Sequence, residues 1–139
     1  APAAMVEAQD WEGITALCQK AVEKSLGFSL AHIGINGESK EEGMATAQWF
    51  ADRFGFTAKE GGRSNFAATY VECCNQKFPG KFGHIGISTL SPQRALAYFQ
   101  AKGIPLREEF KNVDVKGNLV SIYLEEEIGG FAVHIVKKP

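Results

Sequence analysis

The three histidines of the chain are the residues whose spacing most strongly suggests chemistry. His32 and His84 each begin the same four-residue sequence, HIGI, and His134 lies in FAVHIVK toward the end of the sequence. Because side chains alternate along a strand, each HIGI histidine shares one face with a glycine, Gly34 or Gly86, while the isoleucines occupy the other face. A glycine weakens a strand unless another group must come close to it. We therefore expect a cavity above the sheet next to each of these histidines.

A carboxylate joins the histidines by the same alternation. In the sequence YVECC, Tyr70, Glu72 and Cys74 share one face of a short strand. Three imidazoles and the Glu72 carboxylate form a ligand set suited to one divalent ion such as Zn, Ni, Mn, Fe or Co. A second interpretation stays open, in which the histidines are hydrogen-bonded core residues and Glu72 is a solvated edge residue. Cys74 is either a soft ligand or nucleophile, or a small buried strand residue.

Helices and strands that position these residues can be placed from the pattern of the sequence. The N-cap candidates Asp10, Ser39 and Ser91, each followed by a later glycine stop, predict helices over 10–27, 39–55 and 91–103. Alternating or apolar runs predict strands over residues 28–36, 56–61, 64–69, 70–74, 83–89, 106–115, 118–126 and 131–137. The order is one leading helix followed by β-α-β-β-β twice. Each histidine, and Glu72, thus lies on the first or last strand of a unit.

The two β-α-β-β-β units also resemble each other in their helices. The sequences AQWFADRFGF and ALAYFQAKGI follow the two copies of HIGI and are alike. We interpret this as a duplicated supersecondary unit. The alternative is that two β-α units resemble each other without a common origin.

Composition excludes several classes of function. The 139 residues fit one domain, and a formal net charge of −1 gives no basic footprint for nucleic acid. The apolar runs are far shorter than a membrane span, and the opening APAAM lacks the regions of a secretory signal. Three cysteines without CxxC spacing indicate a reducing, cytoplasmic compartment rather than a disulfide framework.

The two units and their ligand candidates resemble the vicinal oxygen chelate superfamily, which includes glyoxalase I, extradiol dioxygenases and bleomycin-resistance proteins. The resemblance implies an α+β fold in which two βαβββ modules, here 28–78 and 79–139, pair into a cupped mixed sheet around a divalent metal, with an extra N-terminal helix. Ligands in that family typically follow the order His, Glu, His, Glu. The matching residues are His32, Glu72, His84 and His134. His134 departs from the usual glutamate, which leaves the site one negative charge poorer and weakens any transfer of glyoxalase activity.

A closer resemblance covers nearly the whole chain. DWEGITALCQKAVEKSLGFSLAHIGIN, RALAYFQAKGI and IYLEEEIGGFAVHIV are similar to the C-terminal extension of certain bacterial 2-keto-3-deoxy-6-phosphogluconate / 2-keto-4-hydroxyglutarate aldolases. In that comparison, residues 1–27 correspond to the last helix of the aldolase barrel and 28–139 to an appended glyoxalase-like domain. The chain is not itself a barrel, which needs at least ~200 residues. The resemblance implies either a domain of a longer aldolase polypeptide or a free-standing relative.

Two functions follow as hypotheses. The first is a metal-dependent lyase or isomerase, in which the ion chelates two adjacent oxygens of a 2-oxo acid or keto-sugar acid and acts as a Lewis acid, with Glu72 as ligand or general base. The second is a non-catalytic metal- or ligand-binding module that regulates an attached aldolase or supports its homo-oligomer. The nearest cations, Arg63 and Lys81, lie in loops, and Tyr123 is a candidate hydrogen-bond donor to the cup. No residue is assigned to substrate binding from the sequence.

Overall fold

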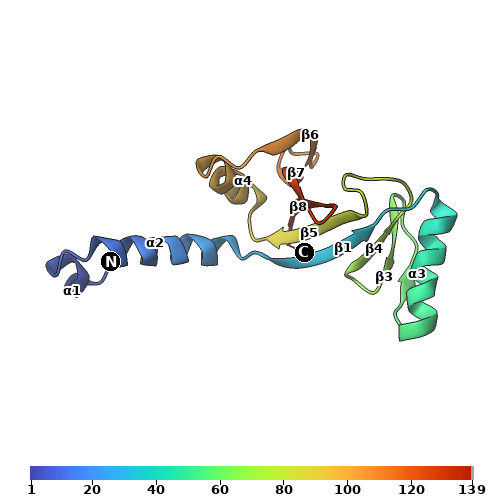
Figure 1. Cartoon of the computed structure of the whole chain (residues 1–139), viewed down its shortest axis with the longest axis horizontal. Coiled ribbons are helices and arrows are strands. Elements are labelled where there is room, and N and C mark those ends of the chain that lie inside the picture. The colour runs from blue at the N-terminus through green and yellow to red at the C-terminus, as the bar shows by residue number, and fades with distance from the viewer. Residues whose placement is uncertain (139) are drawn as a thin grey trace.

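Eight strands form one curled mixed sheet, with two helices against it and two more at the N-terminus (Figure 1). The computed structural model describes residues 1–138. The helices are α1 (Ala3–Glu7), α2 (Trp11–Leu26), α3 (Lys40–Phe54) and α4 (Pro92–Ala101). The strands are β1 (Ser29–Ile35), β2 (Ala58–Lys59), β3 (Ser64–Ala67), β4 (Val71–Cys74), β5 (Gly83–Thr89), β6 (Leu106–Val113), β7 (Leu119–Ile128) and β8 (Phe131–Lys137). The sheet order is β2-β3-β4-β1-β5-β8-β7-β6.

The sheet consists of two halves with the same connectivity. In the first half β1 runs parallel to β4, and in the second half β5 runs parallel to β8. The first strands of the halves, β1 and β5, pair antiparallel and join the halves at the centre. This arrangement confirms the fold class predicted from the sequence, two βαβββ modules in a cupped sheet.

Each half has its own helix and its own small core. The side chain of Ser39 accepts from the backbone N–H of Glu42, and that of Ser91 from the N–H of Arg94, so α3 and α4 begin where their caps predict. Helix α3 packs on β3 and β4 around Ala47, and α4 packs on β7 and β8 around a cluster that includes Ile122. Figure 1 shows the two helices at opposite ends of the sheet. The centre of the sheet is left to the strands that carry the histidines.

The N-terminal segment differs from the single helix expected over 10–27. The structure has an additional short helix, α1, and the helical path is interrupted at Gln9, which has a φ of 54°. The side chain of Asp10 then accepts a hydrogen bond from the backbone N–H of Gly13 and caps α2. Helix α2 extends away from the sheet (Figure 1). Leu26 is its one buried residue, and the Leu26 carbonyl accepts from Thr89 Oγ1 at 2.7 Å. The apolar stripe of α2, which includes Leu17, therefore contacts little within residues 1–138.

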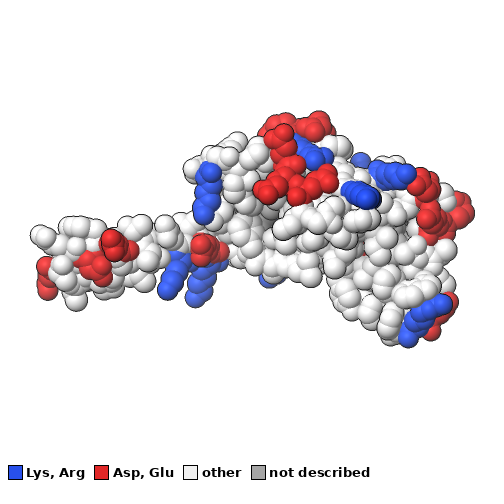
Figure 2. Space-filling model, viewed as in Figure 1, with Lys and Arg blue, Asp and Glu red and all other residues white. Residues whose placement is uncertain are grey.

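Other differences are smaller. Strand β2 has two residues, Ala58–Lys59, where six were expected over 56–61, and it lies at the edge of the sheet. No helix within residues 1–138 is long and apolar enough to cross a membrane. Charges of both signs are scattered over the face seen in Figure 2, with acidic side chains gathered over β6 and β7.

Candidate metal centre

The pairing of β1 with β5 sets each HIGI histidine opposite a glycine of the other half. In the antiparallel register, His32 stands opposite Gly86 and Gly34 stands opposite His84. A Cβ built on Gly86 would lie 2.6 Å from His32 Nε2, and one built on Gly34 would lie 2.3 Å from His84 Nε2. Real Cβ atoms essentially never come within 3.0 Å of such neighbours. The space that the two glycines leave is therefore filled by the imidazoles of the opposite half.

The outer strands add the remaining two candidates in the same rows. Along the parallel pair of β1 and β4, Glu72 lies beside Gly34. Along the parallel pair of β5 and β8, His134 lies beside Gly86. Four strands thus each contribute one ligand candidate, and a glycine separates neighbouring candidates in each row.

The four side chains form one cluster around His32 Nε2. His32 Nε2 lies 3.0 Å from His134 Nε2, 3.2 Å from His84 Nε2 and 3.1 Å from Glu72 Oε2. His84 Nε2 lies 3.2 Å from the same carboxylate oxygen. The structure therefore brings together all four residues predicted from the sequence as metal ligands.

Two observations test whether this cluster fits a metal ion. With metal–nitrogen bonds of about 2.0–2.1 Å, ligand atoms lie about 2.9 Å apart at a right angle and about 3.4 Å apart in a tetrahedron. The separations of 3.0–3.2 Å fall within that range. A neutral imidazole nitrogen has either one N–H or one lone pair, so His32 Nε2 cannot satisfy three polar neighbours by hydrogen bonding alone. A cation bound by these ligand atoms would satisfy all of them, and the residues therefore fit a divalent ion.

Burial and charge place these groups in the protonation states that metal binding requires. Burial lowers the pKa of His32, which Glu72 opposes and His84 reinforces. Burial and the charges of His84 and His32 lower the pKa of His134 to about 3. Burial alone would raise the pKa of Glu72, but hydrogen bonds from His84 and Ser64 and the imidazole charges lower it to about 2. At neutral pH the site therefore offers neutral His32 and His134 beside an ionised carboxylate.

Neighbouring side chains fix the orientation of the ligands. Ser64 Oγ donates to Glu72 Oε1 and leaves Oε2 to face the imidazoles. The Nδ1 atoms of His84 and His134 are buried without a hydrogen-bond partner among residues 1–138. Aromatic rings hold these two imidazoles instead. Tyr123 stacks on His134 with centroids 4.7 Å apart, and Phe78 meets His84 edge-on at 6.0 Å.

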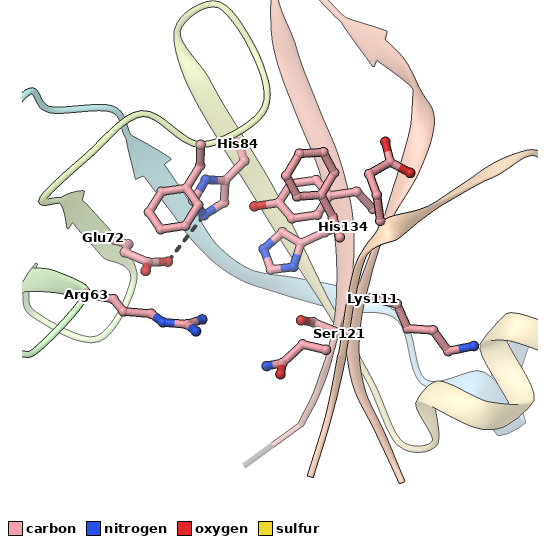
Figure 3. A pocket seen from close by; sticks show the side chains of 11 residues that line it. Arg63, Glu72, His84, Lys111, Ser121 and His134 are labelled. Atoms are coloured by element: carbon pink, nitrogen blue, oxygen red, sulfur yellow. Dashed lines mark hydrogen bonds and ion pairs between the residues drawn. The ribbon is translucent and has the colours of Figure 1, made fainter. Parts of the chain in front are cut away.

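The cluster opens into a cavity of about 370 Å³ (Figure 3). Its lining includes Glu72, His84 and His134 and the expected donor Tyr123, and it includes Arg63 but not Lys81. The other lining residues are Phe78, Glu109, Phe110, Lys111, Asn112 and Ser121.

Strand β6 supplies most of the residues that the sequence did not indicate. Residues 108–111 of β6 stand opposite a single residue of β7, Ile122, because the register shifts between the pairs Arg107–Tyr123 and Asn112–Ser121. The resulting bulge forms one rim of the cavity. Sequence alternation carries no signal for such a shift, so these residues were missed.

Cys74 lies next to the cluster but differs from the ligands in its ionisation. Its Sγ forms a group with Glu72 and His84, and the side chain is fully buried. Burial, with the charges of Glu72 and Cys73, raises the pKa of Cys74 to about 12. A protonated thiol is a poor nucleophile, which favours the role of a small buried strand residue when no metal is bound. The three cysteines of the chain are free.

Comparison with known proteins identifies the fold. No protein-family profile and no curated protein sequence matches the chain. A variant of methylmalonyl-CoA epimerase from Streptomyces coelicolor, in complex with 2-nitronate-propionyl-CoA, matches 78% of this chain and 96% of its own at 15% identity, with a TM-score of 0.56. Methylmalonyl-CoA epimerase from Mycobacterium tuberculosis matches 79% of this chain and 87% of its own at 12% identity, with a TM-score of 0.54. Likeness at such identities establishes architecture alone, and the chain therefore has the vicinal oxygen chelate fold.

Proposed function

We propose that the domain is a metal-dependent enzyme of the lyase or isomerase type that acts on small 2-oxo acids or keto-sugar acids. The observation that carries the proposal is the meeting of four ligand candidates from four strands: His32 Nε2 lies 3.0–3.2 Å from the other three ligand atoms, and His84 Nε2 lies 3.2 Å from Glu72 Oε2. The cluster faces a cavity of about 370 Å³, large enough for a small organic acid. Hydrogen-bonded core histidines would not need to meet at a cavity wall.

The proposed ligands of one divalent ion (Zn, Ni, Mn, Fe or Co) are the Nε2 atoms of His32, His84 and His134 together with Glu72 Oε2. When bound, such an ion supplies Lewis-acid polarisation of a carbonyl oxygen. A 2-oxo acid presents its carbonyl and carboxylate oxygens side by side, which suits chelation. His134 keeps the centre less negative than a second carboxylate would, and this favours binding of an anionic substrate.

Glu72 is also the group that we assign to proton transfer. Glu72 lines the cavity, and its carboxylate can accept the proton from the carbon next to the carbonyl. A pKa of about 2 makes the carboxylate a weak base while the imidazoles contact it. Proton abstraction by Glu72 therefore requires that its contacts with the imidazoles are broken, while Ser64 keeps its hydrogen bond to Glu72 Oε1. Burial raises the pKa of Tyr123, so this cavity residue stays protonated and can donate to a developing oxyanion.

The proposed reaction type and the proposed substrate class rest on different observations. Solved structures of similar fold include methylmalonyl-CoA epimerases in complex with 2-nitronate-propionyl-CoA and with methylmalonyl-CoA, and epimerisation is compatible with proton transfer beside a carbonyl. The choice of 2-oxo acids or keto-sugar acids rests on the resemblance to aldolase extensions. Because α2 resembles the last helix of an aldolase barrel and exposes an apolar stripe, we propose that it contacts an aldolase domain of the same polypeptide.

Deuterium exchange tests the enzymatic proposal. Metal-loaded protein in deuterated water should exchange the C3 protons of 2-oxobutanoate or a related 2-oxo acid, observed as loss of the proton NMR signal. Chelator-treated protein and His84→Ala protein should exchange them no faster than buffer. The metal content of protein purified without chelator should be about one ion per chain. Near-zero metal that reconstitution does not change would contradict the whole proposal.

A non-catalytic module is the second candidate, and the exposed stripe of α2 favours it. A helix whose one buried residue is Leu26 is suited to hold the domain against a larger partner. In that case the metal centre binds a 2-oxo acid to regulate an attached aldolase, or the domain supports its oligomer. Stoichiometric metal without proton exchange across a panel of 2-oxo acids would support this candidate over the enzyme.

A further inference from the structure

Arg63 is a cation in the cavity that the proposed metal chemistry does not use. The residue immediately precedes β3, and its side chain lines the same cavity as Glu72 and His84. In Figure 3 its guanidinium extends from the loop into the space between Glu72 and Ser121. It forms no ion pair or hydrogen bond with any side chain of residues 1–138. A guanidinium presents a planar fork of N–H donors that matches carboxylate and phosphate oxygens, so a free one in a cavity indicates an anionic ligand group.

The loop that carries Arg63 is held in place rather than free to move. The carbonyl of Arg63 accepts from the backbone N–H of Asn75 at 3.1 Å, and the carbonyl of Gly62 accepts from Asn75 Nδ2 at 3.2 Å. The fully buried Asn65 amide donates to Asn75 Oδ1 at 2.8 Å and accepts from the N–H of Gly61. Two asparagines thus fix the backbone beneath the guanidinium. A preorganised cation loses less entropy when it binds a ligand.

Other charged residues of the cavity do not offer the same function. The Lys111 ammonium pairs with Glu108 at 3.1 Å, and in Figure 3 the Lys111 side chain points away from the histidines. Glu109 adds a negative charge on that rim. An anion in the cavity is therefore drawn to the side of Arg63. Ser121 lies on the opposite wall, and its hydroxyl is available to donate, since it forms no hydrogen bond within residues 1–138.

A simple 2-oxo acid would leave Arg63 without a partner. Its carboxylate and carbonyl oxygens are adjacent, so both belong at the histidine cluster if the proposed function holds. We propose that Arg63 binds a second anionic group, a carboxylate or a phosphate, at the other end of the substrate. This inference rests on the proposed function and narrows the substrate to 2-oxo diacids or phosphorylated keto-sugar acids. Arg63 is then a specificity-determining residue.

Calorimetric binding to metal-loaded protein tests the inference without measuring turnover. The probes are 2-oxopentanoate, which has an uncharged tail, 2-oxoglutarate, with a carboxylate tail, and 2-keto-3-deoxy-6-phosphogluconate, with a phosphate tail. At least one charged tail should bind roughly ten-fold or more tighter than 2-oxopentanoate. R63Q should abolish that preference without changing the affinity for 2-oxopentanoate, and R63K should keep part of it. K111Q is the matched control, since it removes another cation of the same lining and should keep the preference.

The outcomes separate this inference from the proposed function. If wild-type protein binds all three acids equally, or if R63Q keeps the preference for a charged tail, the inference is wrong and the proposed function stands. If none of the acids binds, both are wrong. Because Arg63 is exposed, R63Q should match wild type in melting temperature and metal content, so that a lost preference reports binding rather than folding.

Discussion

Gly86→Ala tests whether glycine is what lets His32 reach the metal centre. A Cβ at Gly86 would lie 2.6 Å from His32 Nε2 and 2.8 Å from Nδ1, whereas ordinary van der Waals contact begins at 3.4 Å. The nearest ring atom, His32 Cε1, would lie at 2.4 Å, so the imidazole must recede by about 1.0 Å, the difference between 3.4 and 2.4 Å. Metal–ligand bond lengths tolerate a deviation of only about 0.2 Å. The substitution should thus remove His32 from the ligand set.

Stability should change in the direction opposite to the one that strand propensity predicts. Replacing a strand glycine by alanine without a collision stabilises by about 0.5–1 kcal/mol. Forcing an extra methyl group into a packed site costs about 1–3 kcal/mol. We expect Gly86→Ala to unfold at lower urea concentration than wild type and to bind Zn²⁺ at least about ten-fold more weakly. Gly34→Ala should behave alike through His84, whose ring lies within reach of the new Cβ.

The assay combines competition with a chromophoric zinc chelator and urea unfolding of metal-free protein. Gly62→Ala is the matched control, because a Cβ at Gly62 would meet nothing within 4 Å. It should retain wild-type zinc affinity and lose no stability. If Gly86→Ala binds Zn²⁺ as wild type does and unfolds at a higher urea concentration, the glycines are not what admits the imidazoles and the ligand assignment of His32 is refuted.

Three further predictions concern charge and ionisation around the site. The variant H134E has a second carboxylate in the ligand set, so it should bind Mn²⁺ about ten-fold tighter than wild type and, without metal, melt at a lower temperature. Scanning fluorimetry with and without Mn²⁺ measures both effects. An unchanged Mn²⁺ affinity would place His134 outside the ligand set. Metal-free protein should lose stability as pH falls, because the folded-state pKa values of His134 (about 3) and Glu72 (about 2) lie below the ordinary 6.5 and 4.5, and the unfolded state binds more protons. The loss of stability due to His134 develops between about pH 6.5 and 3, and by pH 5 it amounts to about 2 kcal/mol relative to neutral pH. Urea titration at several pH values measures it, and a stability that does not change with pH would contradict it. A thiol reagent should modify exposed Cys18 quickly and reach buried Cys73 and Cys74, whose pKa values are about 11 and 12, only in denaturant, and three fast thiols in folded protein would contradict their burial.

Local patterns predicted the parts of the fold that depend on local physics. The caps Ser39 and Ser91 locate α3 and α4, because a side-chain oxygen that satisfies a free N–H acts within four residues. Alternation placed His32, Glu72, His84 and His134 toward one cup because successive side chains of a strand point to opposite faces of the sheet. The short α1 has no such cap and was not expected.

Register between strands could not be predicted, since it depends on contacts far apart in the chain. Leu30 shows the limit, because simple alternation puts it on the face of His32. The register shifts between Leu30 and His32, and Leu30 instead joins Ile33 at an apolar hollow on the other face. The same kind of shift in β6 brings Asn112 opposite Ser121 and builds the rim of the cavity. That Gly34 makes room for an imidazole of the other half also appears only once the strands are paired.

The two halves of the cup are equivalent in their backbone but differ in charge at one pair of equivalent ligand positions. A rotation that exchanges β1 with β5 and β4 with β8 maps His32 onto His84 and Glu72 onto His134. One of these last two equivalent positions carries a charge and the other does not. With glutamate at both positions, the two sides of the ligand cluster would carry the same charge. In this chain a substrate with two unlike oxygens meets unlike sides, and we expect its more negative oxygen to settle toward His134. The difference at this one position between the two halves thus favours one orientation of the bound substrate over the other.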